Sequence, residues 1–221
     1  MVISNGARVR IKKLGEPFAL ALGRLGLTPD GLTLVGFGIT ALGAVLLAGQ
    51  LWLAGGVVIF AGGVFDMFDG TLARATGRVS RFGAFMDSVF DRWGEALVYL
   101  GVIIGCSRAG FGDGPWLAGA AMASAFLVSY VRAKSEGLGF TAGTGMAAIG
   151  LMPREVRLVV LTLGLVLAGA AGGVSSALDT PGSTCLAAAL AIIAAGATIT
   201  VIQRVLHVRG QAAAEARERP S

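Results

Sequence analysis

The sequence predicts an all-α membrane protein, in which six transmembrane helices follow an N-terminal interfacial amphipathic helix. Three observations support this fold class. Hydrophobic residues make up 55% of the 221 residues and charged residues only 14%, which is far from the composition of a soluble domain. The apolar residues gather in runs that approach the roughly 20 residues needed to cross a bilayer as a helix. Polar residues lie mostly between these runs.

Six apolar runs mark the expected transmembrane helices. Hydropathy places them at residues 31–49, 53–74, 83–105, 115–136, 154–174 and 184–206. We therefore expect one membrane domain over residues 1–221, with residues 1–26 at the membrane surface and residues 211–221 as a polar tail. Glycines inside the runs, such as Gly36, Gly38 and Gly43, would let neighbouring helices pack closely.

The basic residues predict the orientation in the membrane. If six helices alternate in direction, both termini share one face with the loops around residues 75–82 and 137–153. Sixteen of the 18 lysine and arginine residues then lie on that face or at its helix ends, while Arg92 lies within the third run and Arg108 on the opposite face. Because basic residues concentrate in cytoplasmic loops, we expect both termini in the cytoplasm and the protein in the inner or plasma membrane.

The two ends of the chain differ in character. The basic segment from Arg8 to Leu22 has apolar residues at spacings that a helix would gather on one side. This pattern favours an interfacial helix on anionic lipid, and no nucleic-acid partner is expected. Residues 211–221 are polar, alanine-rich and of mixed charge, so we expect a frayed or disordered end.

Four aspartates, which we call the acidic cluster, are candidate metal ligands. Asp66 and Asp69 are three residues apart near the end of the second run, and Asp87 and Asp91 are four apart near the start of the third. Each pair shares one face of a helix. The short loop between the two runs makes them antiparallel neighbours, so the four carboxylates should converge near the membrane surface.

Divalent cations would balance this negative charge, because desolvation and mutual repulsion make four close carboxylates costly. Neither cysteine nor histidine accompanies them in the sequence, and an all-oxygen set favours Mg²⁺ or Mn²⁺ over zinc. Four carboxylates suit two ions, an arrangement typical of phosphoryl transfer. The alternative is that the aspartates only form ion pairs with neighbouring arginines, which are Arg74, Arg78, Arg81 and Arg92.

The acidic cluster belongs to a longer pattern, D-x2-D-G-x2-A-R-x8-G-x3-D-x3-D, which the chain matches in full. Its eight specified positions are Asp66, Asp69, Gly70, Ala73, Arg74, Gly83, Asp87 and Asp91. The pattern resembles the signature of the CDP-alcohol phosphotransferases, which transfer a phosphatidyl-type group from a CDP-linked lipid to an alcohol. The segment from Leu27 to Asp30, together with Thr33, is also similar to this family.

The resemblance implies a fold of six transmembrane helices, a homodimer and roles for named residues. Cytidine diphosphate would be held over two metal ions by Asp30, Thr33, Gly70, Arg74 and Ser80. One ion would be ligated by Asp66, Asp69 and Asp87, and the other by Asp66, Asp87 and Asp91. Asp91 would also be the general base that takes the proton of the attacking hydroxyl.

Four arginines near the same face are candidate ligands for a phosphate on the acceptor, because arginine grips a phosphate dianion through paired donors. They end the fourth run, begin the fifth and end the sixth: Arg132, Arg154, Arg157 and Arg204. The alternative is that these arginines only anchor helix ends at the cytoplasmic surface.

Segments of the chain resemble the phosphatidylinositol phosphate synthases and the archaeal archaetidylinositol phosphate synthases. These segments are residues 65–70, 85–92, 129–134 and 201–204. The resemblance implies inositol 1-phosphate as acceptor and CDP-diacylglycerol or CDP-archaeol as donor. One departure is that Pro153 precedes Arg154, where this branch tends to show R-P-x-R, although the spacing of Arg154 and Arg157 is kept.

Two other functions stay open. A phosphatidylglycerophosphate synthase, or an enzyme for another acceptor alcohol, would share the donor machinery. A small ion-coupled transporter would explain intramembrane acids and six spans, but not the spacing of the acids. Glu95 extends the face of Asp87 and Asp91 by four residues, and we expect it to pair with Arg92 or to close the polar cavity.

Overall fold

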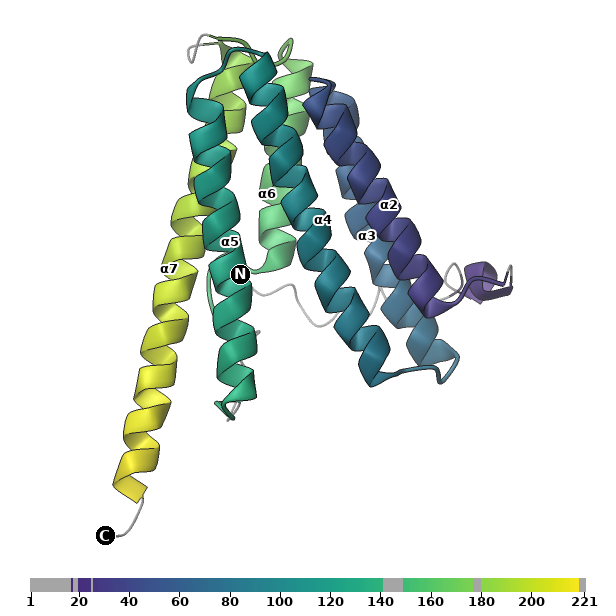
Figure 1. The fold of residues 1–221 in the computed structure, drawn as a ribbon, viewed down its shortest axis with the longest axis vertical. Coiled ribbons are helices and arrows are strands. Elements are labelled where there is room, and N and C mark those ends of the chain that lie inside the picture. The colour runs from purple at the N-terminus through teal and green to yellow at the C-terminus, as the bar shows by residue number, and fades with distance from the viewer. Residues whose placement is uncertain (1–16, 18–19, 25, 141–148, 177–179, 219–221) are drawn as a thin grey trace.

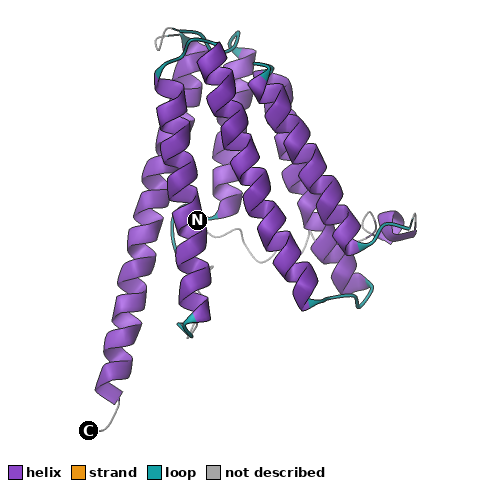
Figure 2. Ribbon diagram, viewed as in Figure 1, coloured by secondary structure: helices purple, strands orange, loops and turns teal. Residues whose placement is uncertain are grey.

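The computed structural model describes residues 17, 20–24, 26–140, 149–176 and 180–218, and the regular secondary structure in these residues is entirely helical (Figure 2). The helices are α2 (Pro29–Ala48), α3 (Trp52–Ala75), α4 (Arg81–Arg108), α5 (Asp113–Gly137), α6 (Arg154–Ala170) and α7 (Pro181–Glu218). Each corresponds to one predicted apolar run. The all-helical class is therefore confirmed.

Four of these helices, α2, α3, α5 and α7, are long and apolar enough to cross a membrane. The other two helices are not among these candidates. α4 carries Asp87, Asp91 and Glu95 along one face, and α6 has only 17 residues. Six transmembrane helices therefore stay a prediction. Most of the predicted interfacial helix lies outside the described residues, although residues 20–24 are helical.

The six helices form a closed ring. Close backbone packing joins α2 to α3, α3 to α6, α6 to α7, α7 to α5, α5 to α4, and α4 back to α2. Figure 1 shows the helices converging at the end where the short α2–α3 and α4–α5 connections lie, and spreading apart at the other end. We call the second end the open end. In this order α4 and α6 face each other across the ring.

Apolar packing fills the convergent half of the ring. The main core cluster includes Trp52, Tyr99, Val102, Leu165 and Leu190, which come from the parts of their helices nearest the short connections. Glycines allow α2 and α4 to approach closely, because a Cβ on Gly101 would lie 2.4 Å from the carbonyl oxygen of Ala44. The open half has smaller apolar clusters, such as Leu32 with Leu72, beside the polar side chains described below.

Two helix ends differ from the expectation. The fifth run was expected to reach residue 174, but α6 ends at Ala170 because Gly172 and Gly173 adopt φ values of 93° and 92°, which end a right-handed helix. The tail from residue 211 was expected to be frayed, whereas α7 continues to Glu218. Alanine, glutamate, arginine and glutamine are strong helix formers, so this polar segment extends the last helix.

Candidate functional site

The predicted donor and metal residues gather at the open end of the ring, on helices that the sequence separates. The start of α2 brings Asp30 and Thr33, and the end of α3 brings Asp66, Asp69, Gly70 and Arg74. Ser80 precedes α4, whose first turns carry Asp87 and Asp91, and α6 begins with Arg154. Four helices therefore contribute to one region.

Side-chain caps fix where α2 and α4 begin. Thr28 Oγ1 accepts a hydrogen bond from the Gly31 backbone N–H at 3.1 Å, and Ser80 Oγ accepts one from Gly83 at 2.8 Å. The two helix starts lie side by side, because a Cβ on Gly83 would lie 3.3 Å from Asp30 Oδ1. Glycine at position 83 thus leaves room between them.

A cavity of about 290 Å³ opens between the starts of α2 and α4 and the end of α3. We call it the nucleotide-side cavity. Its lining includes the five residues predicted to contact the nucleotide, which are Asp30, Thr33, Gly70, Arg74 and Ser80. Arg78 also lines it but was not predicted as a nucleotide contact. The sequence signal that could have identified Arg78 is its position in the loop between the two pairs of aspartates.

Two members of the acidic cluster, Asp69 and Asp87, also line the nucleotide-side cavity. Asp69 is 7% exposed, and Thr33 Oγ1 donates to one of its oxygens at 2.7 Å while the Gly70 backbone N–H donates to the other. Asp87 forms no hydrogen bond or ion pair in the part of the chain that the structure describes. Asp69 is thus fixed in place, whereas the carboxylate of Asp87 is free to take a ligand.

The other two members share one arginine. Nη2 of Arg154 lies 3.0 Å from Asp66 Oδ2 and 2.7 Å from Asp91 Oδ1, so the first residue of α6 connects to α3 and α4. Gly36 on α2 makes room for this arrangement, because a Cβ there would lie 2.3 Å from Asp66 Oδ1. Sequence reasoning treated Gly36 as one packing glycine among many, and nothing in its local sequence distinguishes it.

The acidic cluster suits a hard divalent cation by its chemistry. Its donors are all carboxylate oxygens, they come from two adjoining helices, and Asp87 is unpaired beside a cavity. As the side chains stand, no three acidic, histidine or cysteine side chains among the described residues converge on one ion position. The guanidinium of Arg154 neutralises Asp66 and Asp91 instead. The assignment of the four aspartates as metal ligands stays a prediction.

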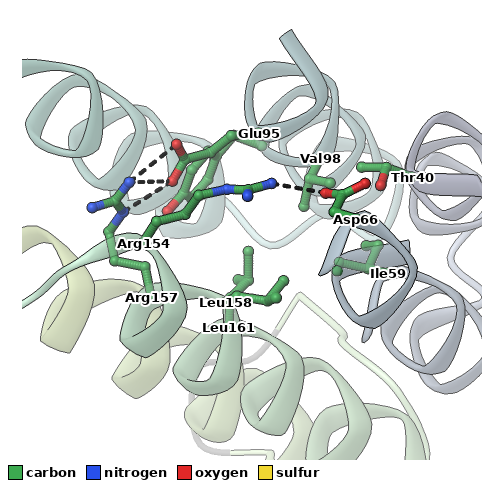
Figure 3. Close-up of a pocket in the computed structure, with 11 residues that line it drawn as sticks. Thr40, Ile59, Asp66, Glu95, Val98, Arg154, Arg157, Leu158 and Leu161 are labelled. Atoms are coloured by element: carbon green, nitrogen blue, oxygen red, sulfur yellow. Dashed lines mark hydrogen bonds and ion pairs between the residues drawn. The ribbon is translucent and has the colours of Figure 1, made fainter. Parts of the chain in front are cut away.

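A second ionic layer lies one helical turn deeper. Glu95 on α4 accepts two hydrogen bonds from Arg157, from Nε at 2.9 Å and from Nη2 at 3.1 Å (Figure 3). Glu95 also accepts a hydrogen bond from Arg92 Nη1 at 2.9 Å. Arg157 is only 2% exposed. A cavity of about 40 Å³ separates this layer from Asp66 and Arg154. The expected pairing of Glu95 with Arg92 is confirmed, and its contact with Arg157 was missed.

The other two arginines predicted for the acceptor have different partners. Arg204, 3% exposed, donates to the backbone carbonyls of Ile149 at 3.0 Å and Val128 at 2.6 Å. Arg132 forms a surface ion pair with Glu136 at 2.9 Å, one turn along the same helix. Among the four candidates, Arg154 is therefore the residue that contacts the acidic cluster.

Comparison with known proteins identifies the family of this chain. The family model for CDP-alcohol phosphatidyltransferase matches residues 26–208. The chain is 36% identical over 217 residues to the phosphatidylinositol phosphate synthase of Streptomyces avermitilis, covering 96% of this chain and 84% of that protein. It is 35% identical over 155 residues to the archaetidylinositol phosphate synthase of Pyrococcus horikoshii, covering 70% of this chain and 77% of that protein.

Solved structures of the Mycobacterium tuberculosis phosphatidylinositol phosphate synthase share the fold. The structure with CDP-DAG bound superimposes with a TM-score of 0.75 at 27% identity, covering 89% of this chain and 94% of that one. The complex with manganese and citrate gives a TM-score of 0.73 at 27% identity, covering 88% of each chain. The matched family region, the signature residues on α3 and α4 and the shared fold lead to one conclusion: the chain belongs to the CDP-alcohol phosphatidyltransferase family, whose members are membrane-integral transferases of phospholipid biosynthesis.

Proposed function

We propose that the chain transfers the phosphatidyl, or archaetidyl, group of a CDP-linked lipid to a hydroxyl of inositol 1-phosphate and releases CMP. One observation carries this proposal. Asp69 and Asp87 belong both to the acidic cluster and to the nucleotide-side cavity, while Arg154 on α6 contacts Asp66 and Asp91. A donor pyrophosphate and an acceptor phosphate could thus meet over the same carboxylates.

The nucleotide-side cavity is the proposed place for cytidine diphosphate. Asp30, Thr33, Gly70, Arg74 and Ser80 line it and are the proposed contacts. Gly70 leaves space for Arg74, since a Cβ there would lie 3.3 Å from Arg74 Nη1. Arg74 and Arg78 bring positive charge to the cavity, which would stabilise the phosphate of the departing CMP.

The proposed reaction is an attack by the acceptor hydroxyl on the phosphorus that carries the lipid. A new P–O bond forms, the bond from that phosphorus to the bridging oxygen breaks, and CMP leaves with that oxygen. Asp91 takes the proton of the hydroxyl as general base. Its side chain is 16% exposed and lies beside Arg154, within reach of the region where the two substrates would meet.

The proposed metal ligands are Asp66, Asp69 and Asp87 for one ion, and Asp66, Asp87 and Asp91 for the other. Bound Mg²⁺ or Mn²⁺ would neutralise the pyrophosphate and the charge that develops on the leaving group. The manganese in the M. tuberculosis structure supports a divalent ion in this fold. Chelation with EDTA should abolish CMP release, and added Mn²⁺ or Mg²⁺ should restore it.

Arg154 is the proposed principal ligand of the acceptor phosphate. Its ion pairs with Asp66 and Asp91 both use Nη2, and in the described residues no hydrogen bond uses its Nε or Nη1. Each of these nitrogens can still donate a hydrogen bond to a phosphate oxygen. Three further arginines stay in the proposal as residues around this site: Arg132, Arg157 and Arg204. The contacts of Arg157 and Arg204 favour a structural role for these two.

We also propose that α4 and α6 cross the bilayer and that the open end faces the cytoplasm. A helix of 17 residues is about 25 Å long, close to the hydrocarbon thickness of a membrane. The open end carries the strong excess of basic residues described above. A homodimer, which the family resemblance implies, belongs to the proposal and can be tested by crosslinking in native membranes.

A panel of acceptors tests the proposed function. Purified protein with Mn²⁺ and CDP-diacylglycerol is incubated with inositol 1-phosphate, inositol, glycerol 3-phosphate or serine, and CMP release and the mass of the lipid product are measured. We expect turnover with inositol 1-phosphate alone. Turnover with glycerol 3-phosphate instead would identify a phosphatidylglycerophosphate synthase and would refute the assignment of the acceptor.

A further inference from the structure

The contact between Glu95 and Arg157 is a buried bridge across the ring. Both oxygens of Glu95 are used, by Arg157 Nε at 2.9 Å and Nη2 at 3.1 Å, and Arg157 Nη1 donates to the Met152 carbonyl at 3.0 Å. Figure 3 shows the two planar groups facing each other. Paired contacts of this kind fix direction as well as distance, because both planes must align.

The bridge connects two helices that are not among the closely packed pairs. The backbone of α6 packs against α3 and α7, while that of α4 packs against α2 and α5. In the open half of the ring, α4 and α6 are connected through Glu95–Arg157 and Asp91–Arg154. The direction in which α6 presents its first turn therefore depends on these ion pairs.

Glu95 also holds Arg92, which donates to Ser129 on α5. One carboxylate thus connects α4, α5 and α6. The nearest other carboxylate for Arg92 is Asp91, at 3.7 Å. If the charge of Glu95 were removed, Arg92 and the buried Arg157 would lose the carboxylate that they share.

We infer that Glu95 is a positioning residue for Arg154. Arg154 and Arg157 lie three residues apart on α6, so they share a face one turn apart. By holding Arg157, Glu95 fixes the rotation of α6 and directs Arg154 toward Asp66 and Asp91. The consequence for acceptor binding rests on the proposed function, in which Arg154 grips the acceptor phosphate.

Kinetics of Glu95→Gln and Arg157→Lys test this inference. Both variants lose the paired contact, and Arg157→Lys also keeps the charge balance. We expect KM for inositol 1-phosphate to rise about tenfold or more, which is the scale of a lost charge-assisted hydrogen bond. KM for CDP-diacylglycerol and the affinity for Mn²⁺, measured by electron paramagnetic resonance, should stay nearly unchanged. Glu95→Asp, which keeps the charge on a shorter side chain, should restore part of the loss.

The matched control is Glu155→Gln, which makes the same chemical change at an exposed position of the same helix turn. It should leave all three quantities unchanged. If Glu95→Gln and Arg157→Lys lower only the unfolding temperature and leave the acceptor KM unchanged, Glu95 has a purely structural role and the inference is wrong. Arg157→Lys decides the question if Glu95→Gln is too unstable to purify.

Arg154→Gln in the same series separates this inference from the proposed function. If that variant leaves the acceptor KM unchanged, Arg154 does not bind the acceptor phosphate and the proposed assignment fails. If Arg154→Gln raises the acceptor KM while the variants at Glu95 and Arg157 do not, the assignment holds and the positioning role of Glu95 is refuted.

Discussion

The four aspartates of the acidic cluster have different partners, although the sequence presents them as equivalent. Asp69 is held by Thr33 and a backbone N–H, Asp66 and Asp91 share Arg154, and Asp87 faces the cavity without an ion pair among the described residues. Substitutions should therefore have different effects. Removing Asp69 leaves the Thr33 hydroxyl with only its 3.3 Å hydrogen bond to the Pro29 carbonyl, whereas removing Asp91 leaves Arg154 with Asp66 as its partner.

Asp91→Asn tests the proposed base. The amide cannot accept the proton of the acceptor hydroxyl, so kcat should fall by roughly 10² to 10⁴. The variant should still fold, because Asp66 continues to pair with Arg154. CMP release and thermal unfolding in detergent are the measurements. Asp113→Asn, at an exposed position in the first turn of α5 at the convergent end, is the control. Retained turnover in Asp91→Asn would rule out Asp91 as the general base.

Gly36→Ala tests the room that α2 leaves for Asp66. The new methyl group would lie 2.3 Å from Asp66 Oδ1, so the carboxylate must turn away. A displacement of about 1 Å at a catalytic group can cost on the order of 100-fold, and we expect kcat/KM to fall by about 10- to 100-fold. Stability should change little, because only a side-chain end has to move.

The control for Gly36→Ala is Gly38→Ala, on the same helix, where a Cβ would meet nothing within 4 Å. It should keep full activity and gain slightly in helix stability. Equal activity losses in both variants would show that general crowding of α2, and not the position of Asp66, is responsible.

At the residue scale, the sequence predicts which side chains form the site better than it predicts their partners. The signature spacing identifies the aspartates and Arg74, because it fixes positions on two consecutive helices. Contacts between distant segments follow no local pattern. Arg157 was expected beside the acceptor phosphate, yet it pairs with Glu95, 62 residues earlier in the chain.

At the scale of elements, two helix starts carry capping residues that a sequence can show, whereas two of the helix ends differ from the hydropathy prediction. Thr28 and Ser80 mark the starts of α2 and α4. Hydropathy gave no sign that α7 continues through its polar tail, because it detects the apolar run and not the helix itself. Helix propensity of residues 211–218 was the better indicator.

Ser80→Ala and Thr28→Ala form a matched pair of cap variants. Each loses one hydrogen bond to a first-turn N–H, which should cost about 1 kcal/mol of stability in both. Only Ser80 lines the nucleotide-side cavity, so only Ser80→Ala should also raise KM for the CDP-linked lipid. Donor titrations and thermal unfolding distinguish the effects. An equal donor KM in the two variants would argue against a contact between Ser80 and the nucleotide.

At the scale of the whole molecule, the order of helices around the ring could not be predicted from the sequence. Hydropathy gives the number of apolar runs but does not say which runs touch. The contact of α3 with α6 depends on close approaches such as that of Gly63, where a Cβ would lie 2.3 Å from Leu158 Cδ2. Consecutive helices joined by short loops were the neighbours that could be expected.

Reporter fusions test the proposed topology. With six spans and the open end in the cytoplasm, alkaline phosphatase inserted at residues 109–112 should be active outside the cytoplasm of a bacterial host. Insertions at residues 76–79, or fusions after residue 221, should be inactive. Fluorescent-protein fusions at the same positions should give the reverse result. An active phosphatase at residues 76–79 would contradict the orientation inferred from the basic residues.

The length of α7 provides a place to attach a second protein for structural work. Arg204 is still in contact with α5, but the helix continues for 14 more residues, which at 1.5 Å per residue is about 20 Å (Figure 1). A rigid helical protein grafted in register after Glu218 would project from the small enzyme as a fiducial for electron cryomicroscopy.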